Sequence, residues 1–331
     1  MESVRETVDG ECSVFRTVTT IGDAWSWLVL REVIFDGVER FDEFQARLGV
    51  ARSTLAGRLE HLTAGGVLRR DERSYVPTER GADFFGCLMT AMAWGDRWCT
   101  SDEDPPLVAV HAGCGRPTTA EMRCSHCHRP LRARDVRYER RPGPQDPRLA
   151  APQRHRAPGL DLLERRRPST IARALQVMGD RWSGLVIREA FFGVRRFDDF
   201  QRRLAIATNI LARRLERLTG HGVLERVPYR HQPLRHEYRL TEKGLDLYPV
   251  PLAMLTWGDR WLTGRRRPPV PLTHLECGVR FTAVLCCNQC GESISRPDVE
   301  FTAPPTASRR AVRAAQKRSP ATGCPLPRAF P

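Results

Sequence analysis

The chain has 331 residues, more than the roughly 100–150 of an average domain, which indicates two or three domains. Apolar residues make up 41% and charged residues 28%, so the composition supplies hydrophobic cores and excludes wholesale disorder. No stretch approaches the roughly 18 uninterrupted apolar residues of a membrane span, and the first residues lack the basic and apolar regions of a signal peptide. We therefore expect a soluble cytoplasmic protein.

The net charge of +14 is concentrated in two segments. Residues 137–167 carry a net charge of +5 and residues 309–331 carry +6, and both segments are rich in Pro, Ala and Arg. Because they lack apolar periodicity, we predict a flexible linker over 137–167 and a disordered basic tail over 303–331. The overall charge is therefore only weak evidence for a nucleic-acid partner.

The chain contains one sequence plan twice. Residues 21–48 align with 178–204, residues 53–70 align with 209–226, and the motif WGDRW occurs at 94–98 and again at 257–261. The second copy has extra residues between Leu224 and Leu240, as expected for a hairpin loop of variable length. The repeat predicts two copies of one domain, over residues 12–100 and 168–263.

In chain order, each copy predicts helices, a hairpin and a closing helix. The apolar spacing predicts one core helix through residues 14–28 or 171–185, then a short amphipathic helix over 41–48 or 197–204. A third helix opens at good capping residues, Ser53 and Thr54 or Thr208 and Asn209, and stops at paired glycines. Two short strands with a basic loop follow, and a last helix ends at WGDRW. This order predicts a winged helix-turn-helix, so the expected fold class is mainly α with small β-wings.

Several spaced motifs occur in the same order in both copies. They are GDxW-x4-L-x-RE from Gly22 or Gly179, RFxxF, L-x-x-RL-x-x-L, T-x-x-G after the wing, and WG-x-x-W, with a cysteine near the start at Cys12. Over residues 12–98 and 169–261 the chain resembles the HxlR-type winged helix-turn-helix transcriptional regulators. The resemblance implies a DNA-binding fold that works as a homodimer joined through its outer helices. Two copies on one chain then indicate a covalent pseudo-dimer, and pairing with a second chain stays open.

The residues expected to touch DNA lie at the start of the third helix and on the wing, because recognition helices present these positions to base edges and wings take phosphates. In copy one the candidates are Arg52, Ser53, Thr54, Arg58, Arg69, Arg70 and Arg73. In copy two they are Thr208, Asn209, Arg213, Arg214, Arg226, Arg230, Arg235 and Arg239. The alternative is that these side chains form a solvated helix face. Residues 1–136 carry a net charge of −4 and residues 168–308 carry +7, so we expect copy two to dominate DNA binding.

A cysteine and histidine pattern follows each winged helix with identical spacing. His111, Cys114, Cys124 and Cys127 recur as His274, Cys277, Cys287 and Cys290. In a cytosolic chain, paired C-x2-C spacing favours a metal over disulfides, and three thiolates with one imidazole make a closed tetrahedral zinc site. We therefore predict two small zinc-ribbon-like modules, over 107–136 and 270–302, each with its own structural zinc. The alternative is a set of reduced thiols that bind no metal.

Two further expectations concern function. Cys12 occupies the motif position through which some HxlR-like regulators respond to oxidants, so it is a candidate redox switch, although a packed, idle cysteine is the plainer interpretation. No nucleotide-binding, metalloprotease or nucleophile motif is present, so we do not expect an enzyme. The competing function is a zinc-ribbon protein-interaction adaptor of the transcription machinery. The sequence names neither the operator nor a small-molecule or redox effector.

Overall fold

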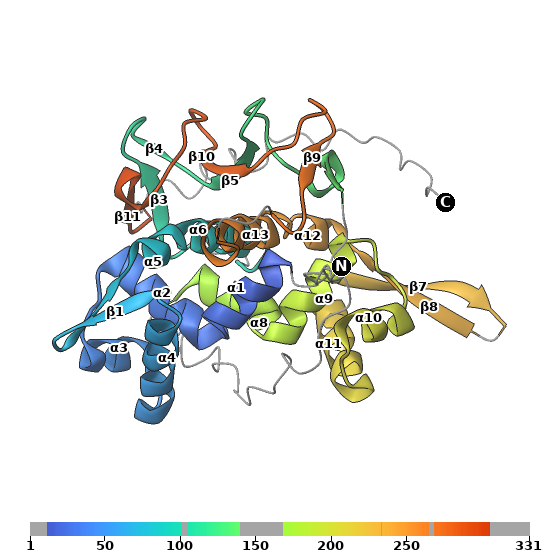
Figure 1. Ribbon diagram of the computed structural model, residues 1–331, viewed down its shortest axis with the longest axis horizontal. Coiled ribbons are helices and arrows are strands. Elements are labelled where there is room, and N and C mark those ends of the chain that lie inside the picture. The colour runs from blue at the N-terminus through green and yellow to red at the C-terminus, as the bar shows by residue number, and fades with distance from the viewer. Residues whose placement is uncertain (1–11, 101–104, 140–167, 233, 265–267, 305–331) are drawn as a thin grey trace, which may run out of the picture.

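The computed structural model describes residues 12–100, 105–139, 168–232, 234–264 and 268–304. Most of the predicted linker, from residue 140, and most of the predicted tail, from residue 305, lie outside these ranges. The described residues are mainly helical with small sheets, as the fold class predicted. Two winged helices lie side by side, and a layer of short strands covers one side of them (Figure 1).

Copy one (residues 12–100) follows the predicted order. Its elements are α1 (Ser13–Ile21), α2 (Ala24–Asp36), α3 (Phe41–Leu48), α4 (Arg52–Ala64), β1 (Leu68–Asp71), β2 (Ser74–Pro77), α5 (Glu79–Asp83) and α6 (Phe85–Trp98). Copy two (residues 168–264) repeats them. Its elements are α8 (Thr170–Met178), α9 (Arg181–Phe191), α10 (Phe197–Leu204), α11 (Thr208–Gly220), β7 (Leu224–His231), β8 (Leu234–Leu240), α12 (Glu242–Leu245) and α13 (Pro249–Leu262).

The first segment of each copy forms two helices, so the prediction of one continuous core helix was wrong. The break falls at the Gly-Asp pair of the repeated motif. Asp23 caps α2 by accepting hydrogen bonds from the backbone N–H groups of Trp25 and Ser26, and Asp180 caps α9 in the same way. Both helices of the pair bury apolar residues, so the apolar spacing in the sequence continues across the break and does not reveal it.

The wings differ in length between the copies. Strands β1 and β2 pair antiparallel over four residues each, from Leu68 opposite Pro77 to Asp71 opposite Ser74. Strands β7 and β8 pair from Leu224 opposite Leu240 out to His231 opposite Leu234, with a register shift between Pro228 and Arg230. The predicted insertion therefore extends the hairpin of copy two, which projects well beyond its helices (Figure 1).

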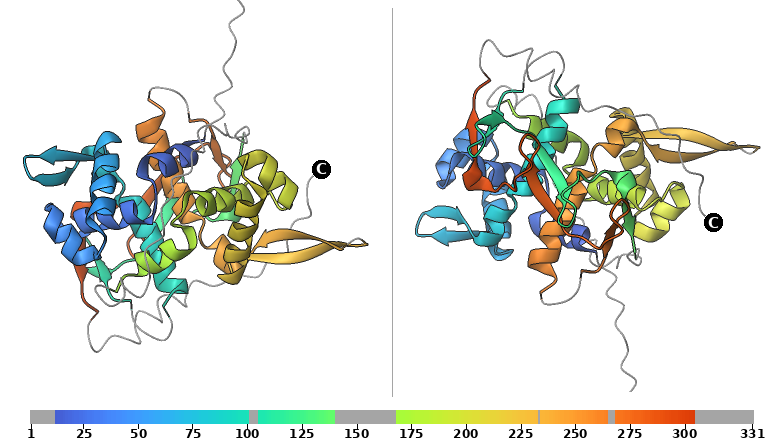
Figure 2. Two further views of the ribbon diagram at one scale, coloured as in Figure 1. Left: turned by 90° about the horizontal axis from the view of Figure 1, so that it is seen from below. Right: turned by 90° about the horizontal axis from the view of Figure 1, so that it is seen from above.

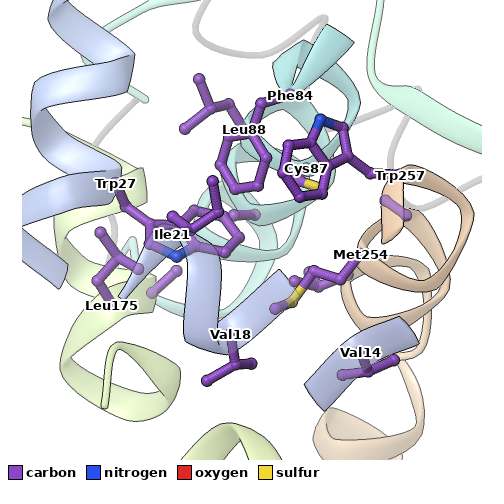
Figure 3. Packing of buried hydrophobic residues seen from close by; sticks show 14 of the residues in the cluster. Val14, Val18, Ile21, Trp27, Phe84, Cys87, Leu88, Leu175, Met254 and Trp257 are labelled. Atoms are coloured by element: carbon purple, nitrogen blue, oxygen red, sulfur yellow. The ribbon is translucent and has the colours of Figure 1, made fainter. Parts of the chain in front are cut away.

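The copies pack against each other through their first and last helices. Helix α1 of copy one lies on α13 of copy two, and α6 lies on α8. The backbone N–H of Ala24 donates to the carbonyl of Gly179 at 2.8 Å, and the Thr17 hydroxyl donates to the carbonyl of Met254, also at 2.8 Å. Side chains from both copies interleave in one hydrophobic core, where the rings of Phe84 and Trp257 meet edge to face at 5.6 Å (Figure 3).

The glycines of the two WGDRW motifs make this packing possible. A Cβ atom on Gly95 would lie 2.3 Å from the carbonyl oxygen of Thr170, and one on Gly258 would lie 2.5 Å from that of Ser13. Contacts this short exclude any side chain. The motif therefore marks where α6 and α13 approach the first helix of the opposite copy.

The cysteine-rich segments form one layer and not the two separate modules that were predicted. The strands are β3 (Val108–His111), β4 (Arg116–Pro117), β5 (Ala120–Cys124), β6 (Val136–Tyr138), β9 (Leu272–His274), β10 (Ala283–Cys287) and β11 (Val299–Thr302), with 3-10 turns at Ala133–Asp135 and Arg296–Asp298. Strand β5 pairs with β10, β3 with β11, and β6 with β9, so each of these pairs joins the two segments. We call residues 105–139 and 268–304 together the Cys-rich body; it lies above the helices in Figure 1 and faces the viewer in Figure 2, right.

The boundary of the first cysteine-rich segment also differs from the prediction. Strand β6 uses Arg137 and Tyr138, which had been assigned to the linker, because β9 of the other segment supplies the partner strand. Among the described helices, none combines the length and the apolar character needed to cross a membrane.

Candidate nucleic-acid interface and metal sites

Helices α4 and α11 lie on the side of the molecule opposite the Cys-rich body, one in each copy (Figure 1). Each buries a row of leucines: Leu55, Leu59 and Leu62 in α4, and Leu211, Leu215 and Leu218 in α11. Seen from below, the two helices and their wings occupy opposite ends of the molecule (Figure 2, left). The outward faces of α4 and α11 are thereby presented on one common side.

The first two turns of these helices hold eight of the fifteen predicted DNA contacts. Arg52, Ser53, Thr208, Asn209 and Arg213 are exposed. Thr54 is half-buried. The N-caps are Ala51 and Ala207, which lie two residues before Ser53 and one residue before Thr208, and neither makes a side-chain capping bond. The prediction that Ser53 or Thr208 caps its helix was therefore wrong, and these side chains stand in the first turn of the helix instead.

Two of the arginines predicted to contact DNA instead form ion pairs within the protein. Arg58 is buried, and its Nε and Nη2 atoms donate to the two carboxylate oxygens of Asp23 at 2.9 and 2.6 Å. Arg214 is half-buried and donates from Nε to Asp180 at 2.8 Å. Asp23 also caps α2, and Asp180 also caps α9. The ion pairs therefore fix α4 against α2 in copy one and α11 against α9 in copy two. This placement corrects the assignment of both arginines to base contacts.

The sequence analysis missed the two aspartates, although a signal for them existed. Asp23 and Asp180 recur at the same motif position, and an arginine recurs at the same position of the third helix. An aspartate and an arginine that are both retained in the two copies indicate an ion pair, and the structure shows this ion pair in both copies.

The wing arginines are exposed in both copies. They are Arg69, Arg70 and Arg73 in copy one and Arg226, Arg230, Arg235 and Arg239 in copy two. In copy one, Arg69 lies 3.1 Å from Asp71, which opposes its charge. In copy two, Arg239 pairs with Glu237, while the longer hairpin carries the other three arginines. The wing of copy two is thus the longer and the more basic one.

The eight predicted metal ligands come together in two clusters, but each cluster draws from both segments. His111 and Cys114 lie with Cys287 and Cys290, whereas Cys124 and Cys127 lie with His274 and Cys277. The predicted grouping within each copy was wrong, because strands β5 and β10 pair with each other and carry each C-x2-C pair to the opposite His-x2-Cys pair. Within each cluster the ligand atoms all lie within 4.8 Å of one another.

The ligand spacing suits a tetrahedral ion. In the second cluster Nδ1 of His274 lies 3.2 Å from Sγ of Cys127 and 3.4 Å from Sγ of Cys277. In the first, the Sγ atoms of Cys114 and Cys287 lie 3.9 Å apart. Metal–sulfur bonds of about 2.3 Å at tetrahedral angles would place two sulfurs about 3.8 Å apart. The residues of both clusters therefore fit a small thiophilic ion.

Local hydrogen bonds favour the thiolate form of one ligand. Burial opposes ionisation of Cys287, but hydrogen bonds from the Thr118 hydroxyl and from the backbone N–H groups of Gln289 and Cys290 lower its pKa to about 7. The Thr118 oxygen lies 3.2 Å from the sulfur. A thiol that ionises near neutral pH is partly in the thiolate form, which is the form that binds a metal.

Two other cysteines are enclosed by protein. Cys12 is fully buried, and Nη1 of Arg188 donates to its sulfur at 3.0 Å across the junction of the copies. A redox role would need this thiol to become accessible. Cys87 lies in the shared core, and burial raises the pKa of its thiol (Figure 3).

Comparison with known proteins identifies both copies. The profile of the HxlR-like helix-turn-helix family matches residues 20–103 and 177–266. The chain is 44% identical over 139 residues to the HTH-type transcriptional regulator Rv3095 of Mycobacterium tuberculosis, covering 42% of this chain and 88% of that protein. It is 38% identical over 93 residues to the regulator sll1512 of Synechocystis, covering 28% and 69%. The crystal structure of PA1607 is 35% identical and covers 41% of this chain and 94% of its own, with a TM-score of 0.37.

Proposed function

Because the chain belongs to the HxlR-like helix-turn-helix family, we propose that it is a cytoplasmic transcriptional regulator that binds double-stranded promoter DNA with both winged helices of one chain. The observation that carries this proposal is the exposure of the first turns of α4 and α11 on one side of the molecule (Figure 1). The contacts of α1 with α13 and of α6 with α8 join the two copies through their outer helices, which supports the proposal of a covalent pseudo-dimer. Binding and not catalysis is the proposed activity.

Copy two supplies the stronger contact in this proposal. Asn209 and Arg213 stand exposed on α11, and their side chains match adenine and guanine edges in the major groove. Residue 57 of α4, which aligns with Arg213, is a glycine, so copy one has no side chain to offer there. Two unlike helices would read two unlike half-sites, which makes the operator an imperfect palindrome.

The test is a fluorescence-anisotropy titration against the protein's own promoter and a random duplex at two salt concentrations. We expect Arg213→Ala to weaken promoter binding by about 1–3 kcal/mol and to relax the preference over random DNA. Arg132→Ala removes the same charge from an exposed site in the Cys-rich body, and it should change neither quantity. Equal binding to both duplexes that disappears at high salt would contradict the proposal and favour the adaptor function.

We further propose that each Cys/His cluster holds one structural zinc ion. When bound, zinc would supply a four-coordinate link with no open position for substrate. His111 and Cys114 with Cys287 and Cys290 would hold one ion, and Cys124 and Cys127 with His274 and Cys277 the other. Since each set takes two ligands from either segment, both ions would tie the end of copy one to the end of copy two.

A further inference from the structure

The two Cys/His clusters differ in how far solvent reaches their ligands. The first cluster contains His111, Cys114, Cys287 and Cys290, and the second contains Cys124, Cys127, His274 and Cys277. In the first cluster Cys290 is exposed, whereas every ligand of the second is buried or half-buried. The reactivity of a thiolate depends on such access, so an incoming ligand can reach the first cluster through Cys290.

The charged neighbours of the two clusters differ as well. Beside the second cluster, Arg129 of one segment forms an ion pair with Glu276 of the other. The matching residues beside the first cluster are Glu292 and Gly113, which cannot form such a pair. These positions therefore link the two segments beside the second cluster only.

Glu292 instead places a carboxylate beside two ligands of the first cluster. Its Oε2 atom lies 4.0 Å from Sγ of Cys290. A Cβ atom on Gly113 would lie 3.3 Å from this oxygen and 3.0 Å from the ring of His111, so the carboxylate is close to that ring too. Carboxylate oxygens are themselves zinc ligands. Glu292 is thus in position to hold an ion that Cys290 has released.

The first cluster is joined to copy one through strand β11. His111 ends β3, which pairs with β11 over copy one (Figure 1). The ring of Phe301 in β11 stacks on Phe35 of α2 at 4.1 Å. Just before β11, Arg296 donates from Nε to the carbonyl of Ile34 at 2.6 Å and from Nη2 to that of Phe35 at 3.0 Å. Arg296 thereby satisfies carbonyls at the end of α2 that have no partner within the helix.

The second cluster has a weaker connection to copy two. Tyr138 of β6 meets Phe192 edge to face at 4.7 Å, which matches the ring contact in copy one. The residue that matches Arg296 is Ala133, so no guanidinium reaches the end of α9 from this position. Helix α2 packs on α4 and carries Asp23, which pairs with Arg58 of α4. The first cluster therefore has a continuous path of contacts to the exposed third helix of its copy.

We propose that the first cluster is an exchangeable metal site, through which the supply of a thiophilic divalent cation such as zinc controls how firmly α2 of copy one is held, and that the second cluster keeps its ion. Cys290 would leave the ion first, and Glu292 would take its place. Each step exchanges one ligand for another and needs no oxidant. This inference rests on the proposed zinc binding and not on DNA binding.

The test begins with zinc release from the full, zinc-loaded chain at neutral pH. The probe is an excess of the chelating dye 4-(2-pyridylazo)resorcinol, whose absorbance reports the released zinc. We expect two separate phases with one ion in each. His111→Ala should remove the fast phase, and His274→Ala should remove the slow phase. Release of both ions at one rate, or a fast phase that persists in His111→Ala, would overturn the proposal.

Conservative variants test the role of Glu292 without removing a ligand. Glu292→Gln keeps the size of the side chain but removes the charged oxygen, and it should slow the fast phase by about tenfold. Glu276→Gln is the control, because it changes an exposed glutamate beside the second cluster and should leave the fast phase unchanged. A fast phase that is the same in Glu292→Gln as in the wild type would contradict the exchange through this carboxylate.

Amide hydrogen exchange of the same samples tests the link to copy one. After release of the first ion, exchange should rise in β11 and in the last turn of α2, and it should stay unchanged in β6 and α9. Arg296→Ala should raise exchange in α2 while both ions stay bound. Unchanged exchange in α2 would overturn the control of copy one. A wild type that binds no zinc would overturn the proposed zinc sites as well, whereas failure to bind promoter DNA would affect the DNA proposal alone.

Discussion

Copy one and copy two agree in their interiors and diverge on their outer faces. The Asp-Arg pair that holds the third helix is present in both, as Asp23 with Arg58 and Asp180 with Arg214. On the exposed side of that helix, Gly57 aligns with Arg213, and the two wings differ in length and charge. The difference shows that the pairing of two winged helices tolerates unlike exposed faces, provided that the contacts between the copies stay in place.

The largest effect is expected from the metal clusters, where the copies depend on each other. His111→Ala combined with Cys290→Ser alters one cluster, so the protein should lose one of the two proposed zinc ions. His111→Ala combined with Cys127→Ser alters both clusters, so it should lose both ions and most of the stability of the Cys-rich body. Elemental analysis of the purified variants, with thermal unfolding of the same samples, measures this.

These two double variants also distinguish the possible groupings of the ligands. If each segment held its own ion, the outcomes would be reversed, because His111 and Cys127 belong to the same segment and His111 and Cys290 do not. Equal metal loss in the two variants would contradict both groupings.

The next largest effect concerns the Asp-Arg pairs. Arg58→Ala should cost about 3 kcal/mol of unfolding free energy, because it removes a buried guanidinium and leaves the half-buried Asp23 without its bidentate partner. Arg214→Ala should cost about 1 kcal/mol, since Arg214 is more exposed and Arg217 still reaches Asp180 at 3.5 Å. Urea unfolding gives both values.

A matched control exists in the exposed pair of Arg52 with Asp42, whose side chains are 68% and 87% accessible. Arg52→Ala should leave the unfolding free energy nearly unchanged. If Arg214→Ala proved as costly as Arg58→Ala, the claimed difference in burial between the copies would be wrong.

The sequence predicted the tandem repeat and the mainly helical fold because both rest on local patterns. The repeat, the helix-turn-helix order and the longer second wing all follow from spacing within one copy, and the eight metal-ligand candidates follow from the spacing of cysteine and histidine. The sharing of ligands between segments could not be predicted in this way. It depends on β5 pairing with β10, and two segments with identical spacing satisfy the same pattern whether they fold separately or together.

The assignment of Arg58 and Arg214 failed for a related reason. Their positions on the third helix suit a DNA contact, but whether a long side chain points outward or back to the core depends on a residue about 35 positions earlier in the chain. Composition and helical periodicity do not determine the direction in which such a side chain points.

A smaller effect is expected at the glycines where the copies approach each other. Gly95→Ala and Gly258→Ala should each cost about 1–3 kcal/mol, because the added Cβ atoms would lie 2.3 and 2.5 Å from backbone oxygens of the opposite copy. Gly57→Ala is the control, since its Cβ would meet nothing within 4 Å, and it should stabilise α4 by about 0.5–1 kcal/mol. A harmless Gly95→Ala in thermal unfolding would show that α6 does not pack on α8 this closely.

The last effect is a pH dependence that differs between the copies. Burial raises the pKa of Asp96 to about 7 and that of its counterpart Asp259 to about 6, from an ordinary value near 4. Between these values the folded state holds a proton that the unfolded state has released, so the stability contribution of each group falls as pH rises, from about pH 4 to 7 for Asp96 and to 6 for Asp259. Asp96→Asn should therefore raise the unfolding free energy relative to the wild type increasingly up to about pH 7, whereas Asp259→Asn should stop gaining at about pH 6. Urea unfolding between pH 5 and 8 measures both profiles, and a gain that is constant over this range would show that neither carboxyl holds a proton in the folded protein.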